Sequence, residues 1–312
     1  MENQTEVSEF ILMGLSNLFK FYNVLFTVFL LLYLATLVGN GAIIIVILTD
    51  PHLQTPMYFF LGNLSCLDIF YSTVTVPKML AGFLSDLHII SFKGCIAQLH
   101  FFHFLGSSEV ILLGVMAYDR YVAICKPLHY ALIMRKEACV LMAAAAWCTG
   151  FVHALMHAVV TARLPFCGPN QIEHFFCDIK PLLKLSCGST YLNLMLLSFV
   201  TSFVALTPFI ITIISYVYII TYLLFKIQSQ SGRQKAFSTC GSHLIVVALL
   251  YVPVLFNYML PTVGAPSQRE MILTLIYSAV TPVLNPLVYT LRNKEVKTSM
   301  KKIVKKKIFS FS

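Results

Sequence analysis

Residues 116–125 read MAYDRYVAIC, and this stretch closes a long apolar segment of the chain. It places Asp119 and Arg120 side by side where a membrane-spanning helix would reach the cytoplasm. Charged side chains within a membrane span are costly, and they mark functional positions. The alternative is an ion pair that only anchors the end of the helix. The stretch therefore predicts a membrane helix with a working site at its inner end.

The composition of the whole chain indicates a membrane protein. The 312 residues are 58% hydrophobic and only 11% charged, whereas soluble domains carry roughly 25% charged residues. Continuous apolar runs long enough to cross a bilayer favour helices over barrel strands. We predict an all-α membrane protein, a single-domain bundle of seven transmembrane helices near residues 23–49, 57–80, 95–125, 139–163, 192–226, 237–260 and 270–291.

The distribution of basic residues predicts the orientation of the bundle. With the N-terminus outside, 15 of the 22 Lys and Arg residues lie on the cytoplasmic side, as the positive-inside rule requires. The net charge of +9 then reflects the inner leaflet and not nucleic-acid binding. Within the single domain, 1–312, we expect residues 1–22 to form an extracellular tail, 23–291 the helix bundle and 292–312 a cytoplasmic tail.

Both tails carry a recognisable pattern. Asn3-Gln4-Thr5 is an N-glycosylation triplet in the outer tail. In the inner tail, RNKEVKTSMKKIVKKKIF at 292–309, apolar residues recur at helical spacing among lysines. This pattern favours a short amphipathic helix on the inner leaflet, with a disordered basic tail as the alternative. The apolar positions are Val296, Met300, Ile303 and Val304.

Four of the nine cysteines fall in segments that we expect outside the membrane, where disulfides form. They are Cys95, Cys167, Cys177 and Cys187. Four cysteines allow three pairings, and spacing alone does not choose among them.

Short motifs recur along nearly the whole chain: Gly39-Asn40, PMYFFLGNLSCLD at 56–68, MAYDRYVAIC at 116–125, KPLHY at 126–130, Ser215-Tyr216, KAFSTCGSHL at 235–244 and PVLNPLVYTLRN at 282–293. In this order and spacing they resemble the olfactory receptors, a group of rhodopsin-like G-protein-coupled receptors. LHFFHFLGS at 99–107 and CDIKPLLKLSC at 177–187 look closest to olfactory receptor family 12, subfamily D. The chain departs from the family at Leu250-Tyr251-Val252, where Phe-Tyr-Gly is common.

The resemblance implies a function and a set of partners. It implies an odorant receptor of the plasma membrane that binds small volatile molecules and activates a stimulatory olfactory-type G protein, raising cyclic AMP. A chaperone for reaching the cell surface is a further candidate partner. No enzyme motif is found in the chain, and no cofactor is expected apart from a sodium ion considered below. The resemblance also pairs Cys95 with Cys177 and Cys167 with Cys187.

The resemblance assigns a cytoplasmic switch. Arg120 is expected to pair with the adjacent Asp119 at rest and to receive the G protein after activation. Pro286 is expected to kink the seventh helix. The remaining residues assigned to this switch are Tyr121, Tyr216, Asn285 and Tyr289.

The resemblance also places the odorant between the outer halves of the third, fifth, sixth and seventh helices. Such pockets are mostly apolar with a few polar groups, and the absence of charged candidates favours neutral or weakly polar odorants. The candidate lining residues are Phe102, His103, Gly106, Ser107, Thr201, Val204, Tyr251, Leu255, Tyr258 and Ser278.

Two acids and four histidines within the spans suggest further sites. Asp68 and Glu109, together with Asn40 and Asn285, could hold a sodium ion or share a proton; a hydrogen-bond network that only specifies packing is the alternative. Two pairs at helical spacing could form a metal site or a proton-sensitive wall, or could be separate histidines with unrelated hydrogen bonds. These pairs are His100 with His103 and His153 with His157.

Two other functional classes stay open at this point. One is a rhodopsin-like receptor for a ligand that is not an odorant. The other is a transporter or channel that uses Asp68 and Glu109 as an ion path. Transporters often contain inverted repeats and broken helix pairs, and we find neither in this sequence.

Overall fold

The computed structural model describes residues 7–14, 20–84, 88–167, 169–226, 230–258, 268–292 and 295–301, of which 231–239, 268–270 and 289–292 are described by their backbone alone. In these residues seven helices are long and apolar enough to cross a membrane, which confirms the predicted bundle. They are α1 (Tyr22–Thr49), α2 (Pro56–Leu84), α3 (Phe92–Cys125), α5 (Lys136–Ala162), the run α7 (Tyr191–Met195), η4 (Leu196–Thr201) and α8 (Ser202–Phe225), then α9 (Gln230–Tyr258), and the run α10 (Gln268–Leu275), η5 (Ile276–Val280) and α11 (Thr281–Arg292).

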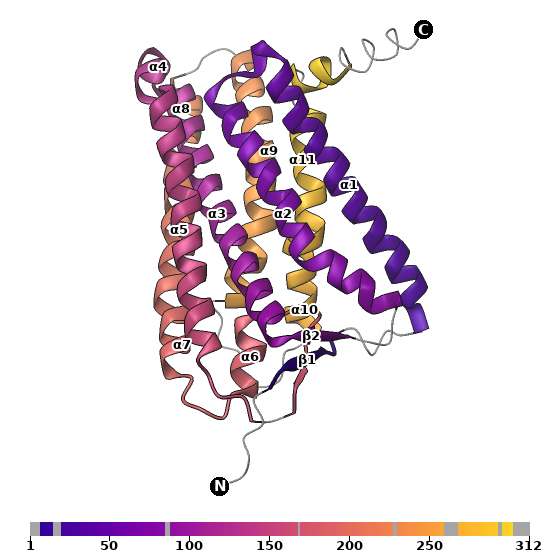
Figure 1. Cartoon of the computed structure of the whole chain (residues 1–312). Helices are drawn as coiled ribbons and strands as arrows, with labels where there is room; N and C mark the ends of the chain where they lie inside the picture. Colours follow the sequence, from indigo (N-terminus) through magenta and orange to yellow (C-terminus); the bar gives the residue numbers. More distant parts are fainter. Residues whose placement is uncertain are drawn as a thin grey trace, which may run out of the picture.

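Shorter elements cover the two ends of the bundle. Figure 1 shows α4 (Tyr130–Ile133) at one end of the bundle and α6 (Ile179–Leu185) at the other. Two single turns, η2 (Pro51–Leu53) and η3 (Pro127–His129), lie in the loops after α1 and α3. The two ends of the bundle therefore differ, and the outer end carries most of the short elements in the loops.

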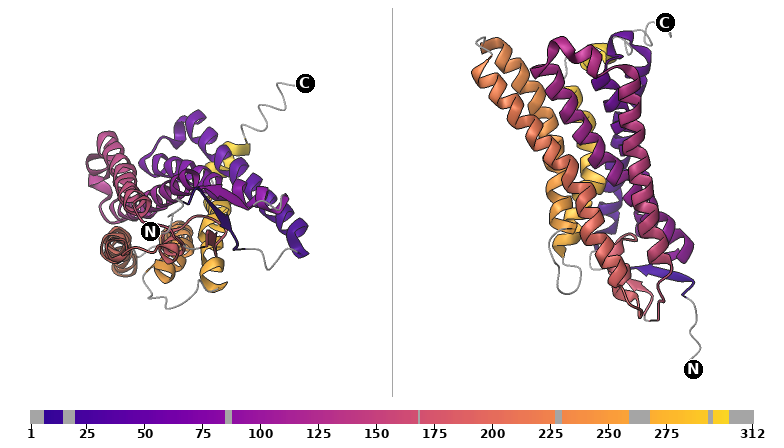
Figure 2. Two further views of the ribbon diagram at one scale, coloured as in Figure 1. Left: turned by 60° about the horizontal axis from the view of Figure 1, so that its bottom comes forward. Right: turned by 90° about the vertical axis from the view of Figure 1, so that its left-hand side faces the viewer.

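Helix α3 is the centre of the bundle. The Ser91 hydroxyl accepts a hydrogen bond from the Gly94 amide at 3.1 Å and caps its N-terminus. At 34 residues the helix is roughly 50 Å long, so it extends past both faces of a bilayer core of about 30 Å. It packs against α2, α5 and α8, and Figure 2 shows it among the other helices. Residues from α3 therefore reach both the outer half of the bundle, where the odorant pocket is expected, and the inner end, where the cytoplasmic switch is expected.

An amide on α1 compensates for a proline on α11. Pro286 has no N–H, so it cannot bond the carbonyl of Pro282 one turn earlier. The Asn40 side chain donates to that carbonyl at 2.9 Å and is fully buried. A Cβ on Gly39 would lie 3.0 Å from the Pro286 ring, so the neighbouring glycine lets α1 approach closely. The Gly39-Asn40 motif is thus explained by packing against Pro286.

A small sheet at the outer end corrects the all-α expectation in one detail. Strand β1 (Glu9–Leu12) lies between β2 (Ile89–Ser91), which is antiparallel to it, and β3 (Gln171–Ile172), which is parallel. Phe10 is completely buried there, with its ring centroid 5.4 Å from that of Phe166. The outer tail is therefore anchored to the first and second outer loops.

Both predicted disulfides are present. Cys95 is bonded to Cys177 with a Cα–Cα distance of 5.4 Å, and Cys167 to Cys187 with 5.8 Å. The Cys95–Cys177 bond fixes the second outer loop to the top of α3. The segment before α6 is held over the helix bundle as a result.

The inner tail is helical over residues 295–301, as the apolar spacing predicts. Val296 is completely buried, the Tyr58 hydroxyl donates to Glu295 at 2.7 Å, and the Ser299 hydroxyl donates to Asp50. The start of this helix therefore contacts the inner ends of α1 and α2. Ile303, Val304 and the glycosylation triplet at Asn3 lie outside the described residues.

Candidate functional site

A cavity of about 50 Å³ lies between the outer halves of α3, α5, η4–α8, α9 and η5. Seven of the ten predicted odorant contacts line it: Phe102, His103, Gly106, Ser107, Thr201, Val204 and Tyr258. The wall is completed by Tyr71, Val110, His153, Ala205, Leu250, Val254 and Tyr277. Aromatic and aliphatic groups with a few hydroxyls and imidazoles are typical of small-molecule pockets.

Three predicted contacts lie elsewhere. Tyr251 is buried, and its hydroxyl donates to the Val110 carbonyl at 2.7 Å, so it fastens α9 to α3 beside the cavity. The Ser278 hydroxyl donates to the Thr274 carbonyl of its own helix at 2.6 Å. Leu255 is partly buried against the hydrophobic core. None of these three lines the cavity, because a step of one residue turns a side chain by about 100° on a helix.

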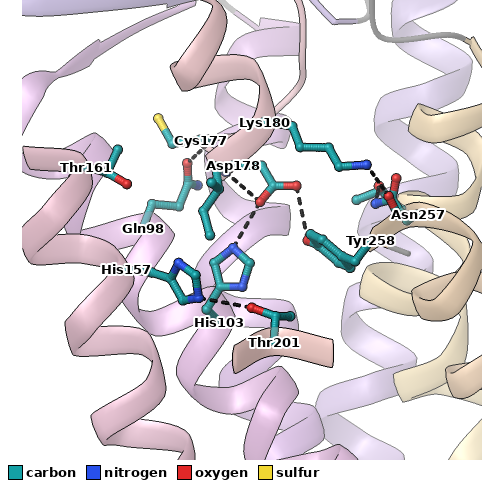
Figure 3. A network of polar contacts seen from close by, with 12 residues as sticks. Gln98, His103, His157, Thr161, Cys177, Asp178, Lys180, Thr201, Asn257 and Tyr258 are labelled. Carbon is teal, nitrogen blue, oxygen red and sulfur yellow. Dashed lines mark hydrogen bonds and ion pairs between the residues drawn. The ribbon is translucent and has the colours of Figure 1, made fainter. Parts of the chain in front are cut away.

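Asp178, which caps the N-terminus of α6, joins three parts of the molecule above the cavity. Its Oδ1 accepts from His103 Nε2 on α3 at 3.0 Å and from the Ile179 amide at 2.7 Å. Its Oδ2 accepts from the Tyr258 hydroxyl on α9 at 3.1 Å. Figure 3 shows the carboxylate between these two side chains. The second outer loop is therefore tied to both walls of the cavity.

Two further contacts hold this loop in place. The Lys180 ammonium donates to the Asn257 carbonyl on α9, and the Cys177 amide donates to the Gln98 side chain on α3 at 3.0 Å. The loop segment is thus bonded to α3 and to α9 by independent groups.

Asp178 is ionised in this setting. Burial raises the pKa of its carboxyl. The hydrogen bond from His103, the nearby imidazoles and the Ile179 amide lower the pKa by more than burial raises it, so the pKa is about 2. An ionised carboxylate only accepts hydrogen bonds, so His103 Nε2 is the donor in this pair. The side chain is only 3% exposed, which strengthens these contacts.

Three of the four predicted histidines form one cluster. The ring centroids of His153 and His157 are 4.7 Å apart, and that of His103 is about 6 Å from both. Thr201 Oγ1 is 3.0 Å from Nε2 of both α5 histidines. The remaining histidine, His100, packs instead on Phe151. The part of the chain that the structure describes contains no group of three His, Cys, Asp or Glu residues arranged to hold a metal.

The two intramembrane acids lie at the centre of the bundle. Asn285 donates to both oxygens of Asp68, at 3.0 and 3.1 Å. Glu109 interacts with Asp68 and lies close to the Asn285 side chain, but neither of its oxygens accepts a hydrogen bond of normal geometry among the described residues. Asn40 does not join them, because it donates to Pro282. Two neighbouring buried carboxyl groups, one of which has both oxygens without a hydrogen-bond partner among the described residues, suit a small cation.

The structure corrects the expected resting pair of Asp119 with Arg120. Asp119 accepts a hydrogen bond from the Tyr130 hydroxyl at 2.8 Å. Consecutive residues on a helix do not face each other. Arg120 interacts electrostatically with Asp119 without a direct ion pair, and it also interacts with Cys240 and His243 on α9.

The other predicted switch residues are dispersed. The Tyr216 hydroxyl lies 2.8 Å from Nδ1 of His243, and the ring of Tyr121 packs on that of Tyr218. Asn285 and Pro286 lie on α11. The side chain of Tyr289 lies outside the described ones.

Sequence reasoning missed Asp178, His243 and Tyr130. Asp178 and His243 lie within the quoted motifs CDIKPLLKLSC and KAFSTCGSHL, and Tyr130 ends KPLHY. The motifs marked the right segments, but the partners come from distant parts of the chain. For Asp178, the adjacent disulfide cysteine was a usable signal of a fixed loop.

The comparisons with known proteins cover nearly the whole chain. A family model described as olfactory receptor matches residues 29–307. Human olfactory receptor 12D1 is 56% identical over 98% of this chain and 96% of its own length. Human olfactory receptor 12D2 is 55% identical over 98% of this chain and 100% of its own length, and human 12D3 is 53% identical over 99% and 98%. These relatives confirm the resemblance to family 12, subfamily D, and favour a receptor over a transporter. The chain belongs to the olfactory receptor family: it is a multi-pass receptor of the plasma membrane and not an enzyme.

Proposed function

We propose that this receptor binds neutral or weakly polar volatile molecules in the outer cavity and, when occupied, activates a stimulatory olfactory-type G protein, which raises cyclic AMP. The observation that carries the proposal is the cavity between α3, η4–α8, α9 and η5. Its candidate orienting groups are the hydroxyls of Ser107 and Thr201 and the imidazoles of His103 and His153. Family membership supports the odorant class.

The polarity of the ligand follows from the charges around the cavity. The oxygens of Asp178 already accept hydrogen bonds from His103 and Tyr258, and Asp178 does not line the cavity. A charged ligand would give up its hydration and find no free counter-charge in the cavity, which costs several kcal/mol. A ligand with one hydroxyl or carbonyl could instead exchange hydrogen bonds with Ser107 or Thr201.

The size of the cavity suggests how binding could drive activation. Pockets for small molecules usually measure roughly 300–1,000 Å³, and this cavity measures about 50 Å³. A ligand must therefore move the walls, and Tyr258 on α9 is one of them. His243, on the same helix 15 residues earlier, interacts with Arg120. Helix α9 thus connects the pocket to the proposed G-protein site, as a two-state bundle requires.

A sodium ion is part of the same proposal. The residues that would hold it are Asp68 and Glu109, because the two Glu109 oxygens are buried and unused among the described residues. Such an ion would supply positive charge between two carboxylates and favour the arrangement of α2, α3 and α11 in which they are close.

The test is a cyclic AMP reporter assay in cells with an olfactory-type G protein, an odorant panel and surface staining. We expect a dose-dependent response that Arg120→Ala abolishes at equal surface expression. Arg135→Ala is the matched control, since Arg135 is an exposed basic residue at the same end of the bundle. A full response from Arg120→Ala would contradict the proposed coupling.

A further inference from the structure

A second and larger hollow lies on the membrane side of the bundle. It measures about 560 Å³ and is almost entirely apolar. Helix α3 forms its floor through Gly114 and Tyr118, and α5 and α8 form its walls. Its rim residues face the lipid: Phe203 is 70% exposed and Ile211 is 42% exposed. We call this hollow the lipid groove.

The groove exists because α5 and α8 diverge. At the outer end, α5 packs against α7 and η4, and Thr201 joins the two walls by its contacts with His153 and His157. Further inward both helices pack on α3. A Cβ on Gly114 would lie 2.6 Å from the Pro208 side chain, so α8 touches the floor closely. The space between α5 and α8 is left to the bilayer.

The lipid groove and the odorant cavity share one wall residue. Val204 lines both of them, so a single isopropyl group separates the two at this point. The groove already has the volume of an ordinary small-molecule site, whereas the odorant cavity does not.

Two hydroxyls in the groove have no internal partner. Threonines within helices commonly bond the carbonyl four residues earlier, as Thr49, Thr73 and Thr212 do at 2.6–2.8 Å. Among the described residues, the side-chain hydroxyls of Thr149 on α5 and Thr207 on α8 make no hydrogen bond, although both residues line the groove. A polar group in hydrocarbon without a partner is costly.

The two threonines lie on opposite walls of a groove that is otherwise almost entirely apolar, Thr149 on α5 and Thr207 on α8. A hydroxyl on a ligand could accept a hydrogen bond from one threonine and donate one to the other.

We propose that the lipid groove binds a neutral, mainly hydrocarbon molecule with one hydroxyl, which enters from the bilayer and passes Val204 into the odorant cavity. The entry step rests on the proposed function; binding in the groove does not. Depth favours a small alcohol over a sterol as the occupant that bonds Thr149. Thr149 is 13 residues from each end of α5, roughly 20 Å along the helix, whereas the hydroxyl of a sterol lies at the membrane surface.

Photolabelling tests the groove without any signalling. The receptor in phosphatidylcholine nanodiscs is irradiated with a diazirine-bearing decanol, and the adducts are located by mass spectrometry. We expect adducts on α5 and α8 that unlabelled 1-decanol suppresses. Ala145→Phe should remove them because Ala145 lines the groove. Its exposed neighbour supplies the control, Ala144→Phe, which should keep them. Equal labelling of both variants overturns the proposal.

Two further probes identify the occupant. A phosphatidylcholine with a diazirine in its acyl chain should label the groove only weakly once decanol is present. If decanol does not suppress this labelling, a lipid chain fills the groove and the proposal fails.

The Thr149→Val, Thr207→Val double variant tests the hydrogen bonds. It should bind decanol roughly fivefold more weakly, as expected for the loss of one net hydrogen bond, and should bind a diazirine-bearing decane as well as the unmodified receptor does. If the double variant binds decanol and decane more weakly by the same factor, the hydrogen-bonding role is overturned.

The entry step is tested with an agonist from the reporter panel. Ala145→Phe should slow the onset of the cyclic AMP response several-fold and leave its maximum unchanged, while Ala144→Phe should do neither. An unchanged onset in a variant that has lost photolabelling would make the groove a separate site and overturn the entry route. A receptor that never signals would refute the proposed function, while the photolabelling result would stand.

Discussion

Replacing Asp178 with asparagine tests whether the outer loop is held by a charge. The pKa of Asp178 is about 2, below the ordinary value of about 3.9 for an aspartate. The difference corresponds to about 2–3 kcal/mol of stabilisation by the ionised group. The pKa is depressed in the fold, so this contribution is present above about pH 4 and is lost as the pH falls toward 2. Asparagine cannot ionise and loses it at every pH.

The assay is the unfolding temperature of the purified receptor in nanodiscs at pH 7. A loss of this size should lower the midpoint by roughly 4–12 °C, given about 2–4 °C per kcal/mol for chains of this order. Glu173→Gln is the matched control, because Glu173 is an exposed acid of the same loop, and it should melt like the unmodified receptor. If Asp178→Asn melts at the temperature of the control, the charge does not hold the loop.

A double-mutant cycle locates the effect in the structure. The Tyr258 hydroxyl donates to Asp178 at 3.1 Å, so Tyr258→Phe alone should cost about 1 kcal/mol. Residues in contact are not additive, and the double variant should therefore lose less than the sum of the single changes. Strict additivity would contradict the contact between the loop and α9.

Three further predictions concern other parts of the chain. Burial lowers the pKa of His174 to about 4, so as the pH falls the unfolded chain takes up a proton near pH 6.5, whereas the folded chain does so only near pH 4. The free energy of unfolding should therefore fall by about 3 kcal/mol between pH 6.5 and 4. In His174→Gln the melting temperature should depend less on pH over that range. Tyr130→Phe removes the hydrogen bond to buried Asp119 and should cost about 1–3 kcal/mol; an unchanged melting point would contradict this. A Cβ on Gly150 would lie 2.2 Å from a side chain of α3, so Gly150→Ala should lose about 1–3 kcal/mol, whereas Gly41→Ala, with open space, should lose nothing.

The bundle could be predicted from the sequence because its cause is local. Each span is a continuous apolar run, and a bilayer allows only a helix there. The strand at Glu9–Leu12 was missed because four residues in a tail carry little signal, and its partners lie 78 or more residues away. Asp119 and Arg120 interact electrostatically but form no direct ion pair in this structure, because consecutive residues on a helix do not face each other.

The pocket could be predicted in part for the same reason. The four α3 candidates share one helix face, so all of them line the cavity. Tyr251 and Ser278 could not be placed, because their orientation depends on hydrogen bonds to Val110 and Thr274. Asp178 contacts three segments at once, and only the folded chain brings them together.

The contact of Asn40 with the Pro282 carbonyl has a consequence for how this sequence can evolve. The carbonyl needs a donor from α1 only because Pro286 lacks an N–H. If alanine replaced Pro286, the helix would supply its own donor, and Asn40→Leu would then be far less harmful than it is now. The two positions, 246 residues apart in the sequence, are therefore expected to show epistasis, and a lineage can lose the amide safely only after it has lost the proline.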